Sequence, residues 1–582
     1  RDAYDRARDW WHDNHLEAKD DLKFARLGQQ WPETVRRQRE LDLRPCEDFN
    51  KMPAFIRQVV NDARQNKPSI KVHPADSGAD PETAEVINGL IRNIEYTSNA
   101  DTAYDTAMEC AVSGGFGYWR IGLDYAYEDS FDMDLSIERI ANPLSVYGDP
   151  YSTAADSSDW MDAFVVDVLS KDQFKARHGE TKTVRDWDDS SWGEEGWRVG
   201  DDVTVAEWWH REQVEIKVQQ FVNVQTGEVQ TYTDEVIAKS EDLQLFIQAG
   251  LLEFKRERMA KTYRVTQNTM TGAEVLSEVK WAGCYIPIVP VYGKRWFVDN
   301  VERCMGHVRL AKDAQRLKNM QLSKLGEISA LSSVEKPILT PEQVAGHQVM
   351  WAEDNLKDYP YLLINPITDQ NGNQAVSGPV AYTRSPAIPP AMAALLQITE
   401  QDMQDILGNP QAGEKVVSNV SGKAVEMIQQ RLDMQTFIYM SNFAKAMKRC
   451  GEIWLSMAKD VYVEEGRQMK VITDNGDTDS VTLMQPTIDQ ETGEVKMAND
   501  LGAAKFDVDV DVGPSSSSKR AATVRALTGM MQITQDPETL QVLGAMAMMN
   551  MEGEGVGDVQ DYFRKRLIRM GVVKPTDAEA EA

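Results

Sequence analysis

The sequence predicts an elongated α+β protein that is predominantly helical and built from more than one structural unit. The chain has 582 residues, several times the usual domain size of about 100–150 residues, so we expect two to four units. Two long segments, 301–331 and 423–463, contain no proline and carry apolar residues at helical spacing. At 1.5 Å per residue such helices would span about 45 Å and about 60 Å, which is longer than a small globular domain requires.

Composition limits the class of protein. The 42% hydrophobic content suits a folded globular chain, and no stretch approaches the roughly 18 consecutive apolar residues of a membrane-spanning helix. The sequence starts at Arg1 with neither a methionine nor an apolar stretch, so we expect no secretion signal. Five cysteines, far apart and without a CxxC pair, argue against a disulfide framework and a zinc site and favour a reducing cytoplasm: Cys46, Cys110, Cys284, Cys304 and Cys450.

The overall charge does not favour DNA binding. The 63 basic and 92 acidic residues give a formal net charge of −29, the wrong sign for gripping a phosphate backbone through counterion release. An acidic surface usually serves solvation. The alternative is a conduit whose acidic lining lets DNA slide without sticking, and charge alone does not decide between the two.

Apolar spacing in the first half of the chain predicts helices followed by strands. Residues 1–30 have the pattern of a helix, and helical spacing returns at 55–60 and 81–108. Short or alternating apolar stretches then predict strands at 70–72, 119–121, 137–140, 164–168 and 203–209, with a hairpin turn at 225–228. We therefore expect a mixed α/β unit at 45–293.

The second half is organised around long helices. After the predicted helix 301–331, residues 334–390 are rich in proline and glycine and predict a compact, turn-rich insertion. A helix at 391–407 and a loop ending near Gly422 lead into the very long helix 423–463. Strand patterns return at 467–512, with turns at 474–476 and 491–493, before a helical segment at 519–570 and an acidic tail after Thr576 that we predict to be disordered.

Two segments resemble binding loops but depart from the required pattern. In 513–520 (GPSSSSKR), serine replaces the second glycine of a phosphate-binding loop and Arg520 replaces its hydroxyl, which favours a linker and helix cap. Residues 507–513 (DVDVDVG) space their carboxylates like a calcium loop, but the glycine comes one residue late and no closing glutamate follows. Alternation of Asp and Val instead predicts a strand with one acidic and one apolar face.

Other candidate sites have structural explanations. The glycine-rich segment 114–117 enters a strand, which favours a bend or close backbone packing over phosphate binding. His12 and His15 have a spacing that could hold a metal, but no further ligands are visible and a solvated pair is the better interpretation. No catalytic constellation stands out, so we predict no catalytic, cofactor-binding or metal-binding residue.

The helix at 301–331 differs from the rest of the chain in charge. A mixed, solvated helix face is the usual explanation. In a tube of such helices, the same basic excess could face DNA or the acidic residues of a neighbouring subunit, and the sequence does not orient the helix. Its basic residues are Arg303, Arg309, Lys312, Arg316, Lys318 and Lys324, against Glu302, Asp313 and Glu327.

Local sequence and the order of the parts resemble the portal proteins of short-tailed enterobacterial phages. No single segment is specific, but together they follow the order of that family along most of the chain. The similar segments are FNKMPAFIRQVVNDARQNKPSIKVHP (49–74), ETAEVINGLIRNIEYTSNADTAYDTA (82–107), GGFGYWR (114–120), VAEWWHRE (205–212), VRLAKDAQRLKN (308–319), SGKAV (421–425) and DVDVGPSSSSKRAATVR (within 507–525).

The resemblance implies a portal-type subunit with a wing, stem, clip and crown. The implied divisions are an N-terminal helical segment of the wing (1–44), the α/β wing (45–293), a stem helix (294–333), the clip (334–386), a returning stem helix (387–408), a channel loop (409–421), a long wing helix (422–463), a β segment of the wing (464–513) and a helical crown (514–582).

The resemblance also implies a function. Such subunits form a ring of about twelve copies around a channel for double-stranded DNA at the capsid vertex. The ring serves genome packaging and ejection, and its clip docks the terminase and later the tail adaptor. Scaffolding and coat proteins are further expected partners. No catalytic residue or cofactor is implied, because the terminase hydrolyses ATP, and the expected location is the virion, with the host cytoplasm during assembly.

One residue is a candidate for DNA contact. The loop 409–421 joins two helices and contains proline, glycine and serine, so we expect it to be mobile. Lys415 is its one basic residue and Glu414 opposes it. Each subunit therefore offers at most a weak phosphate contact, which suits sliding better than holding. An ordinary surface turn with a solvated lysine fits the sequence equally well.

Two other classes of protein stay open at this level. Another ring protein of the virion, such as a tail adaptor, is usually much shorter and lacks the order of helix, insertion and helix. A nucleic-acid enzyme, such as a nuclease or packaging ATPase, would need an intact nucleotide loop or a convergent acidic triad, and neither is visible.

Overall fold

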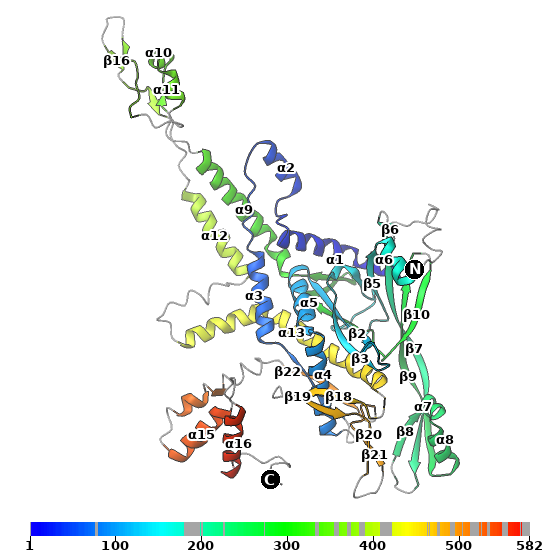
Figure 1. Ribbon diagram of the computed structural model, residues 1–582. Helices are drawn as coiled ribbons and strands as arrows, with labels where there is room; N and C mark the ends of the chain where they lie inside the picture. Colours follow the sequence, from blue (N-terminus) through cyan, green and yellow to red (C-terminus); the bar gives the residue numbers. More distant parts are fainter. Residues whose placement is uncertain are drawn as a thin grey trace. The chain divides into compact units, whose positions relative to one another are not determined.

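The residues that can be described fall into two compact units. The first comprises 1–22, 54–309 and 416–582, and the second comprises 23–53 and 310–415. The computed structural model (Figure 1) describes 2–179, 198–331, 337–407, 422–511, 523–531, 536–549, 557–570 and 572, apart from gaps at 76–79, 200–201, 225–226, 228, 273, 354–359, 369–373, 377, 383–389, 463, 465, 474–477, 489–494, 503–504 and 525.

The protein contains more strand than its hydrophobic pattern indicates. Among the described residues, helix accounts for 47% and strand for 29%, so the α+β class is confirmed while a predominantly helical protein is not shown. Strands β7 (Asp202–Asn223) and β9 (Leu252–Met270) have 22 and 19 residues. The second half of β7 is polar and mostly half-buried, and much of β9 is polar and exposed. Only the buried beginning of β7 therefore has the apolar alternation that predicts a strand.

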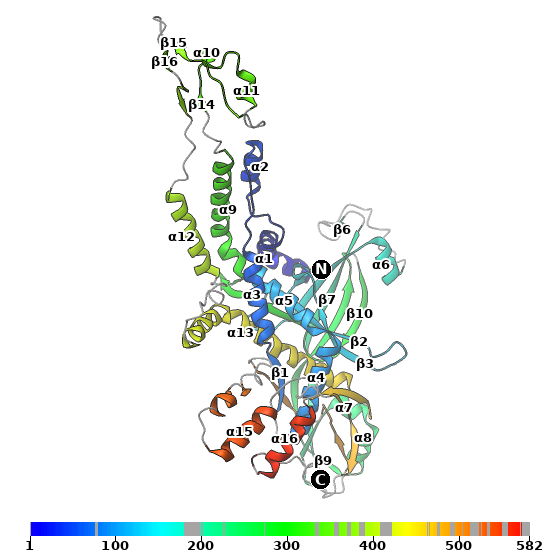
Figure 2. The same cartoon turned by 60° about the vertical axis from the view of Figure 1, so that its left-hand side comes forward.

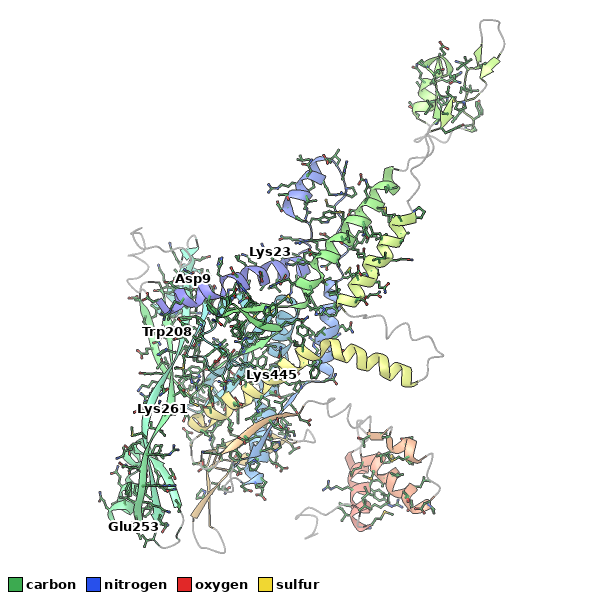
Figure 3. The ribbon with its side chains drawn as sticks, turned by 180° about the vertical axis from the view of Figure 1, so that it is seen from behind. Asp9, Lys23, Trp208, Glu253, Lys261 and Lys445 are labelled. Carbon is green, nitrogen blue, oxygen red and sulfur yellow. The ribbon has the colours of Figure 1, made fainter. Side chains whose placement is uncertain are left out.

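The first unit is built on a seven-stranded antiparallel sheet. Its path runs β10, β9, β7, β5, β4, with β6 and β8 also paired to β7. Strands β7 and β9 continue together as a long ribbon, on which Trp208, Lys261 and Glu253 mark successive positions (Figure 3). The other elements of this region are β4 (Val146–Tyr147), β5 (Asp162–Leu169), α6 (Lys171–His178), β6 (Arg198–Val199), β8 (Val229–Thr233), α7 (Asp234–Lys239), α8 (Glu241–Gln248) and β10 (Val275–Trp281).

Aromatic side chains form the core between helix α1 (Asp2–Arg26) and the sheets. Trp11 is fully buried, and its ring meets that of Phe116 edge-on with 5.4 Å between centroids. The Trp11 indole N–H donates to the carbonyl of Gly148 at 3.2 Å, so burying this ring leaves no polar atom unpaired. Phe116 belongs to a three-stranded sheet of β2 (Phe116–Tyr125), β3 (Met133–Arg139) and β11 (Ile288–Tyr292), with the short helix η1 (Pro143–Ser145) after β3.

The glycine-rich segment 114–117 provides close backbone packing, as its sequence predicts. Gly115 ends helix α5 (Ala100–Gly114) with φ of 104°, a left-handed conformation that glycine adopts without strain. At Gly117 a Cβ would lie 2.1 Å from the carbonyl oxygen of Ala107. Helices α3 (Met52–Gln65) and α4 (Pro81–Thr97) precede α5. The predicted helical segment 81–108 is therefore divided between α4 and α5 at Asn99, whose φ is 50°.

Helix α13 (Gly422–Val461) is the longest element, with 40 residues, and confirms the predicted helix 423–463. A small sheet, β1 (Ser69–Pro74) paired with β22 (Phe506–Asp511), packs on it at Gly451, where a Cβ would lie 2.7 Å from side-chain carbons of Ile70 and Val508. The remaining elements of the first unit are the hairpins β18 (Gln468–Ile472) with β19 (Thr478–Thr482) and β20 (Gln485–Ile488) with β21 (Val495–Ala498), and helices α15 (Pro537–Met549) and α16 (Gly557–Arg569).

The second unit contains helix α2 (Glu33–Leu41), most of α9 (His307–Leu331) and α12 (Pro390–Leu407). Between α9 and α12 the elements are short, as expected for a turn-rich insertion. They are β14 (Pro337–Ile338), α10 (Pro341–Val344), α11 (Gln348–Ala352), β15 (Ile367–Thr368), β16 (Gln374–Val376) and β17 (Ala381–Tyr382), with β14 paired to β17 and β15 paired to β16.

The prediction that a helix starts at Val301 is wrong. Residues 301–305 are strand β13 (Val301–Met305), paired with β12 (Lys294–Val298), and α9 starts only at His307. Asp299 and Asn300 both have positive φ, 51° and 61°, which is the conformation of a two-residue hairpin turn. Glu302 is buried in an ion pair with Arg295 at 2.6 Å. Burial alternates along the strand, with Glu302 and Cys304 buried. Because glutamate counts as polar in a hydrophobic pattern, this alternation is not visible in the sequence.

Other predicted elements are confirmed. Strands occur at each of the five predicted positions, and 507–511 forms β22. The turns at 474–476 and 491–493 and most of 225–228 lie outside the described residues, although the strands on either side of each turn pair as hairpins. The segment 513–520 and the tail after Thr576 also lie outside the described part of the chain.

Replacing Gly117 with alanine should strongly destabilise the first unit. The new methyl group would meet backbone rather than a movable side chain, so we expect Gly117→Ala to lower the free energy of unfolding by about 3 kcal/mol or more. Gly326→Ala on α9 is the control, because no atom lies within 4 Å of its Cβ position. The control should be neutral or stabilising by up to about 1 kcal/mol. Thermal unfolding followed by circular dichroism distinguishes the variants, and equal midpoints would contradict this explanation.

Candidate functional site

The basic helix identified in the sequence pairs with α12 in the second unit (Figures 1 and 2). Lys318 on α9 reaches the carboxylate of Glu400 on α12, and Gln321 donates its side-chain N–H to the hydroxyl of Thr399 at 3.1 Å. Thr399 in turn donates to the carbonyl of Leu395, 2.8 Å away. Polar side chains therefore bridge the two helices, although the buried side-chain oxygen of Gln321 has no hydrogen-bond partner among the described residues.

A second face of α9 binds an extended segment of the chain before α3. Gln315, Asn319 and Ser323 stand at intervals of four residues and are at most 1% exposed. Their side chains bond the backbone of that segment: Gln315 donates to the Phe49 carbonyl at 2.8 Å, Phe49 N–H donates to Asn319 at 3.1 Å, and Glu47 N–H donates to Ser323 at 3.1 Å. This polar ladder was missed in the sequence, where only its four-residue spacing could have indicated it.

The basic residues of α9 and β13 contact acidic or aromatic side chains of their own chain. In the first unit, Arg309 bonds the buried carboxylate of Asp21 at 2.9 Å and also reaches Glu17. In the second unit, the cationic groups of Lys312 and Arg316 lie 5.7 and 5.4 Å from the ring centroid of Phe24. The remaining pairs are Arg303 with Asp13 (2.8 Å), Lys318 with Glu400, and Lys324 with Glu327 (3.2 Å). Each of the six basic residues thus has a contact within its own chain.

Burial and charge oppose each other at Glu400. Burial alone would raise the pKa of this carboxyl, but hydrogen bonds from Lys318 and Lys51 and the charges of these two lysines outweigh it and lower the pKa. The side chain of Lys318 is only 10% exposed. Glu400 is therefore the anion that allows two lysines to gather beside α12.

Apolar side chains of the same helices face solvent. On α9, Leu310, Leu317 and Met320 are 42%, 44% and 48% exposed and follow one another at spacings of seven and three residues. On α12, Leu395 and Ile398 are 45% and 55% exposed. Because polar residues such as Gln315 and Asn319 occupy the buried face of α9, its exposed apolar stripe is available to another polypeptide.

The insertion between α9 and α12 is tied together by its own hydrogen bonds. The side chain of Gln343 donates to the Gly378 carbonyl at 2.8 Å, and the indole N–H of Trp351 donates to the Leu363 carbonyl at 2.9 Å. Large apolar side chains remain exposed around these contacts: Val349, Tyr361, Val380 and Tyr382. The insertion is thus a small folded module with exposed apolar side chains.

The remaining candidates from the sequence do not converge on a chemical site. His12 is exposed, whereas His15 is half-buried among Trp11, Phe116 and Tyr147, where burial lowers its pKa to about 4. The prediction of a solvated pair is therefore wrong for His15. Lys415 lies outside the described residues. Within the described ranges, no three His, Cys, Asp or Glu side chains gather closely enough to bind a metal.

No described helix combines the length and hydrophobicity needed to cross a membrane.

Comparison with known proteins defines the class of this chain as a phage structural protein. It is 36% identical over 574 residues to a protein named "Portal protein" from Acyrthosiphon pisum secondary endosymbiont phage 1, a match that covers 96% of this chain and 79% of that protein. The family model described as "Phage P22-like portal protein" matches residues 1–582. The chain belongs to the P22-like phage portal proteins, and its function is that of a phage portal.

Removing the charge of Glu400 should loosen the helix pair. Glu400→Gln leaves Lys318 nearly buried without an anion, so we expect a loss of about 1 kcal/mol and faster amide hydrogen exchange in α12 at pH 7. Asp402→Asn is the matched control, because Asp402 is an exposed carboxylate on the same helix.

The same pair of variants has an expected pH dependence. Because the pKa of Glu400 is lowered in the folded state, its contribution is complete above the unfolded value of about 4.3 and is lost as the pH falls through the folded value. The difference between wild type and Glu400→Gln should therefore shrink below about pH 4. An exchange rate in α12 that is equal for wild type and Glu400→Gln at pH 7 would refute a role for this carboxylate.

Proposed function

We propose that identical copies of this chain form a ring of about twelve subunits around a channel for double-stranded DNA at the portal vertex of the capsid. The observation that carries this proposal is helix α9, which buries a ladder of polar residues and leaves Leu310, Leu317 and Met320 exposed. A closed ring covers such a stripe on every subunit, whereas a monomer leaves it in water. Membership of the portal family supports the same assembly.

The conduit is passive in this proposal. The chain supplies no catalytic residue and no cofactor, and the terminase hydrolyses ATP. The net charge of −29 per subunit is repeated around the ring, which keeps DNA from adhering along the channel. Assembly takes place in the host cytoplasm, and the ring then resides in the virion.

The parts of the subunit keep the roles that their order suggests. We assign the wing to 1–293 and 422–513, the stem to 294–333 and 387–408, the clip to 334–386, the channel loop to 409–421 and the crown to 514–582. The polar contact between α9 and α12, including the bond between Gln321 and Thr399, supports a two-helix stem. The compact module built on Gln343 supports a separate clip.

A charge on the exposed stripe should prevent ring assembly. Leu317→Asp places a carboxylate where the proposed neighbour packs, so sedimentation velocity should shift from a ring of roughly a dozen copies toward monomer. Leu245→Asp is the control, since Leu245 is 60% exposed on α8, outside the stem. An unchanged ring in Leu317→Asp would exclude this stripe from the interface. A strictly monomeric wild-type protein across concentration and salt would exclude the ring itself.

Deleting residues 345–380 should abolish terminase binding while sparing the first unit. A folded, turn-rich insertion between two antiparallel helices is suited to contact partners at their far end. Pull-down with purified terminase measures the binding, and the thermal unfolding of the first unit checks its integrity. Scaffolding, coat and tail-adaptor proteins serve as further baits. Terminase binding that survives the deletion would remove the clip assignment.

Lys415 is the proposed weak DNA contact of the channel loop. Reversing its charge adds repulsion once per subunit around the channel, so Lys415→Glu should leave ring assembly intact and change DNA packaging or retention. Packaged genome length and genome loss from purified particles are the measurements. The isosteric control, Lys415→Met, removes the charge without reversing it and should have a smaller effect. Normal packaging and retention in Lys415→Glu would rule out a contact by this residue.

A further inference from the structure

The sheet of β1 and β22 has two edges that differ in their protection. The N–H of Ala75 donates to the carbonyl of Lys505 at 3.0 Å, which sets the hydrogen-bonding phase of the pair. Given the register His73 with Asp507 and Lys71 with Asp509, these residues bond each other across the ladder. The intervening residues Val72 and Val508 then point their backbone N–H and C=O groups away from the partner strand.

The outer edge of β1 is closed by a side chain. Asn88 on α4 accepts a hydrogen bond from the N–H of Val72 at 2.8 Å and donates to its carbonyl at 3.3 Å, so its amide replaces a neighbouring strand. Asn88 is only 8% exposed. No strand or side chain of the described residues does the same for Phe506 and Val508 on the outer edge of β22. An unpaired edge of this kind is a template for another strand.

The open edge borders a preformed groove of the first unit, with a volume of about 990 Å³. Its floor is the second half of α13, the helix on which Figure 3 labels Lys445. Its opposite wall is held to that floor, because Gly283 N–H donates to Asp460 at 2.7 Å and Cys284 N–H donates to Ser456 at 2.9 Å. The groove therefore does not need to open before a strand enters.

Charge defines the chemistry of the occupant. Asp507, Asp509 and Asp511 are exposed on the outer face of β22, so a strand added beside it would place its outward side chains next to a row of carboxylates. The inward side chains would meet Leu455 and a floor of mixed charge, where Lys448 and Lys459 lie beside Glu452 and Asp460. An extended segment with basic outward residues and uncharged inward residues satisfies both faces.

We propose that the free edge of β22 binds an extended, basic segment of a different polypeptide, which adds to the β1–β22 sheet as a third strand. The row of carboxylates repels nucleic acid. A second copy of this chain is the alternative occupant, which the exchange experiment below distinguishes. The proposal is independent of the ring and channel roles, since it concerns a surface of the first unit outside the stem and clip.

Amide hydrogen exchange of the full-length protein tests the open edge directly. Asp507 and Asp509 N–H groups bond β1 and should exchange slowly, whereas the N–H of Val508 should exchange at least ten-fold faster although it lies between them. Adding an eight-residue peptide of alternating valine and lysine should slow exchange at Val508. Protection of Val508 on ring assembly without peptide would assign the edge to a second copy and overturn the choice of a different polypeptide.

Peptide binding measured by fluorescence anisotropy tests the occupant. The alternating peptide should bind at least ten-fold more tightly than a peptide with four valines followed by four lysines, which has equal charge but no alternation. Val508→Pro removes the outward N–H without breaking the ladder to β1 and should weaken binding ten-fold or more. Val508→Ala is the control for lost packing against α13 and should bind normally.

A gentler variant keeps the test valid if Val508→Pro does not fold. Asp507→Asn combined with Asp509→Asn changes only exposed side chains, and it should reduce the preference for lysine over glutamate in alternating peptides. The proposal would be overturned if the alternating and block peptides bound equally, or if the double variant kept its preference for lysine. The aspartates would then serve only to prevent strand pairing at this edge.

Discussion

The hydrogen bonding between α9 and the extended segment 47–51 is the constraint on which the second unit depends. Gln315, Asn319 and Ser323 are at most 1% exposed, and a buried amide or hydroxyl without a partner costs roughly 1–3 kcal/mol. The backbone of Glu47, Phe49 and Lys51 supplies those partners. This requirement fixes which face of α9 turns inward, and the exposed position of its apolar stripe follows from it.

Intrachain pairing also changes the meaning of the basic residues near α9. In a protein that conducts DNA, a run of basic side chains on a helix is easily interpreted as a set of DNA contacts. Here Arg309 forms an ion pair with the buried Asp21, Lys318 forms one with Glu400, and Arg316 lies over the ring of Phe24. Breaking either ion pair leaves a buried charge on Asp21 or Lys318, so Arg309 and Glu400 are needed for the integrity of the subunit.

The first unit relies on the close approach of backbones. Glycine at position 117 lets β2 lie against the carbonyl of Ala107 on α5, and Gly451 lets the β1–β22 sheet lie on α13. Large rings such as Trp11 then fill the space between α1 and the sheets. The same packing of the β1–β22 sheet on α13 leaves the outer edge of β22 open beside a groove, which is where we propose that a strand docks.

The sequence by itself determined the elements whose signal is local, and the family. The helix of α13, the strand of alternating Asp and Val, the turn-rich insertion and the close packing at 114–117 all follow from periodicity or from glycine and proline, and the resemblance to phage portals rests on segments along the whole chain. Only the tertiary structure decided the rest. Residues 301–305 form a hairpin strand because Glu302 is buried against Arg295. The orientation of α9 depends on a segment far away in the chain, since the bond from Phe49 to Asn319 spans 270 residues. His15 is half-buried by aromatic rings of distant strands. Contacts between residues so far apart in the chain leave no periodic pattern in the sequence, because the neighbour that favours each residue type lies outside the local segment.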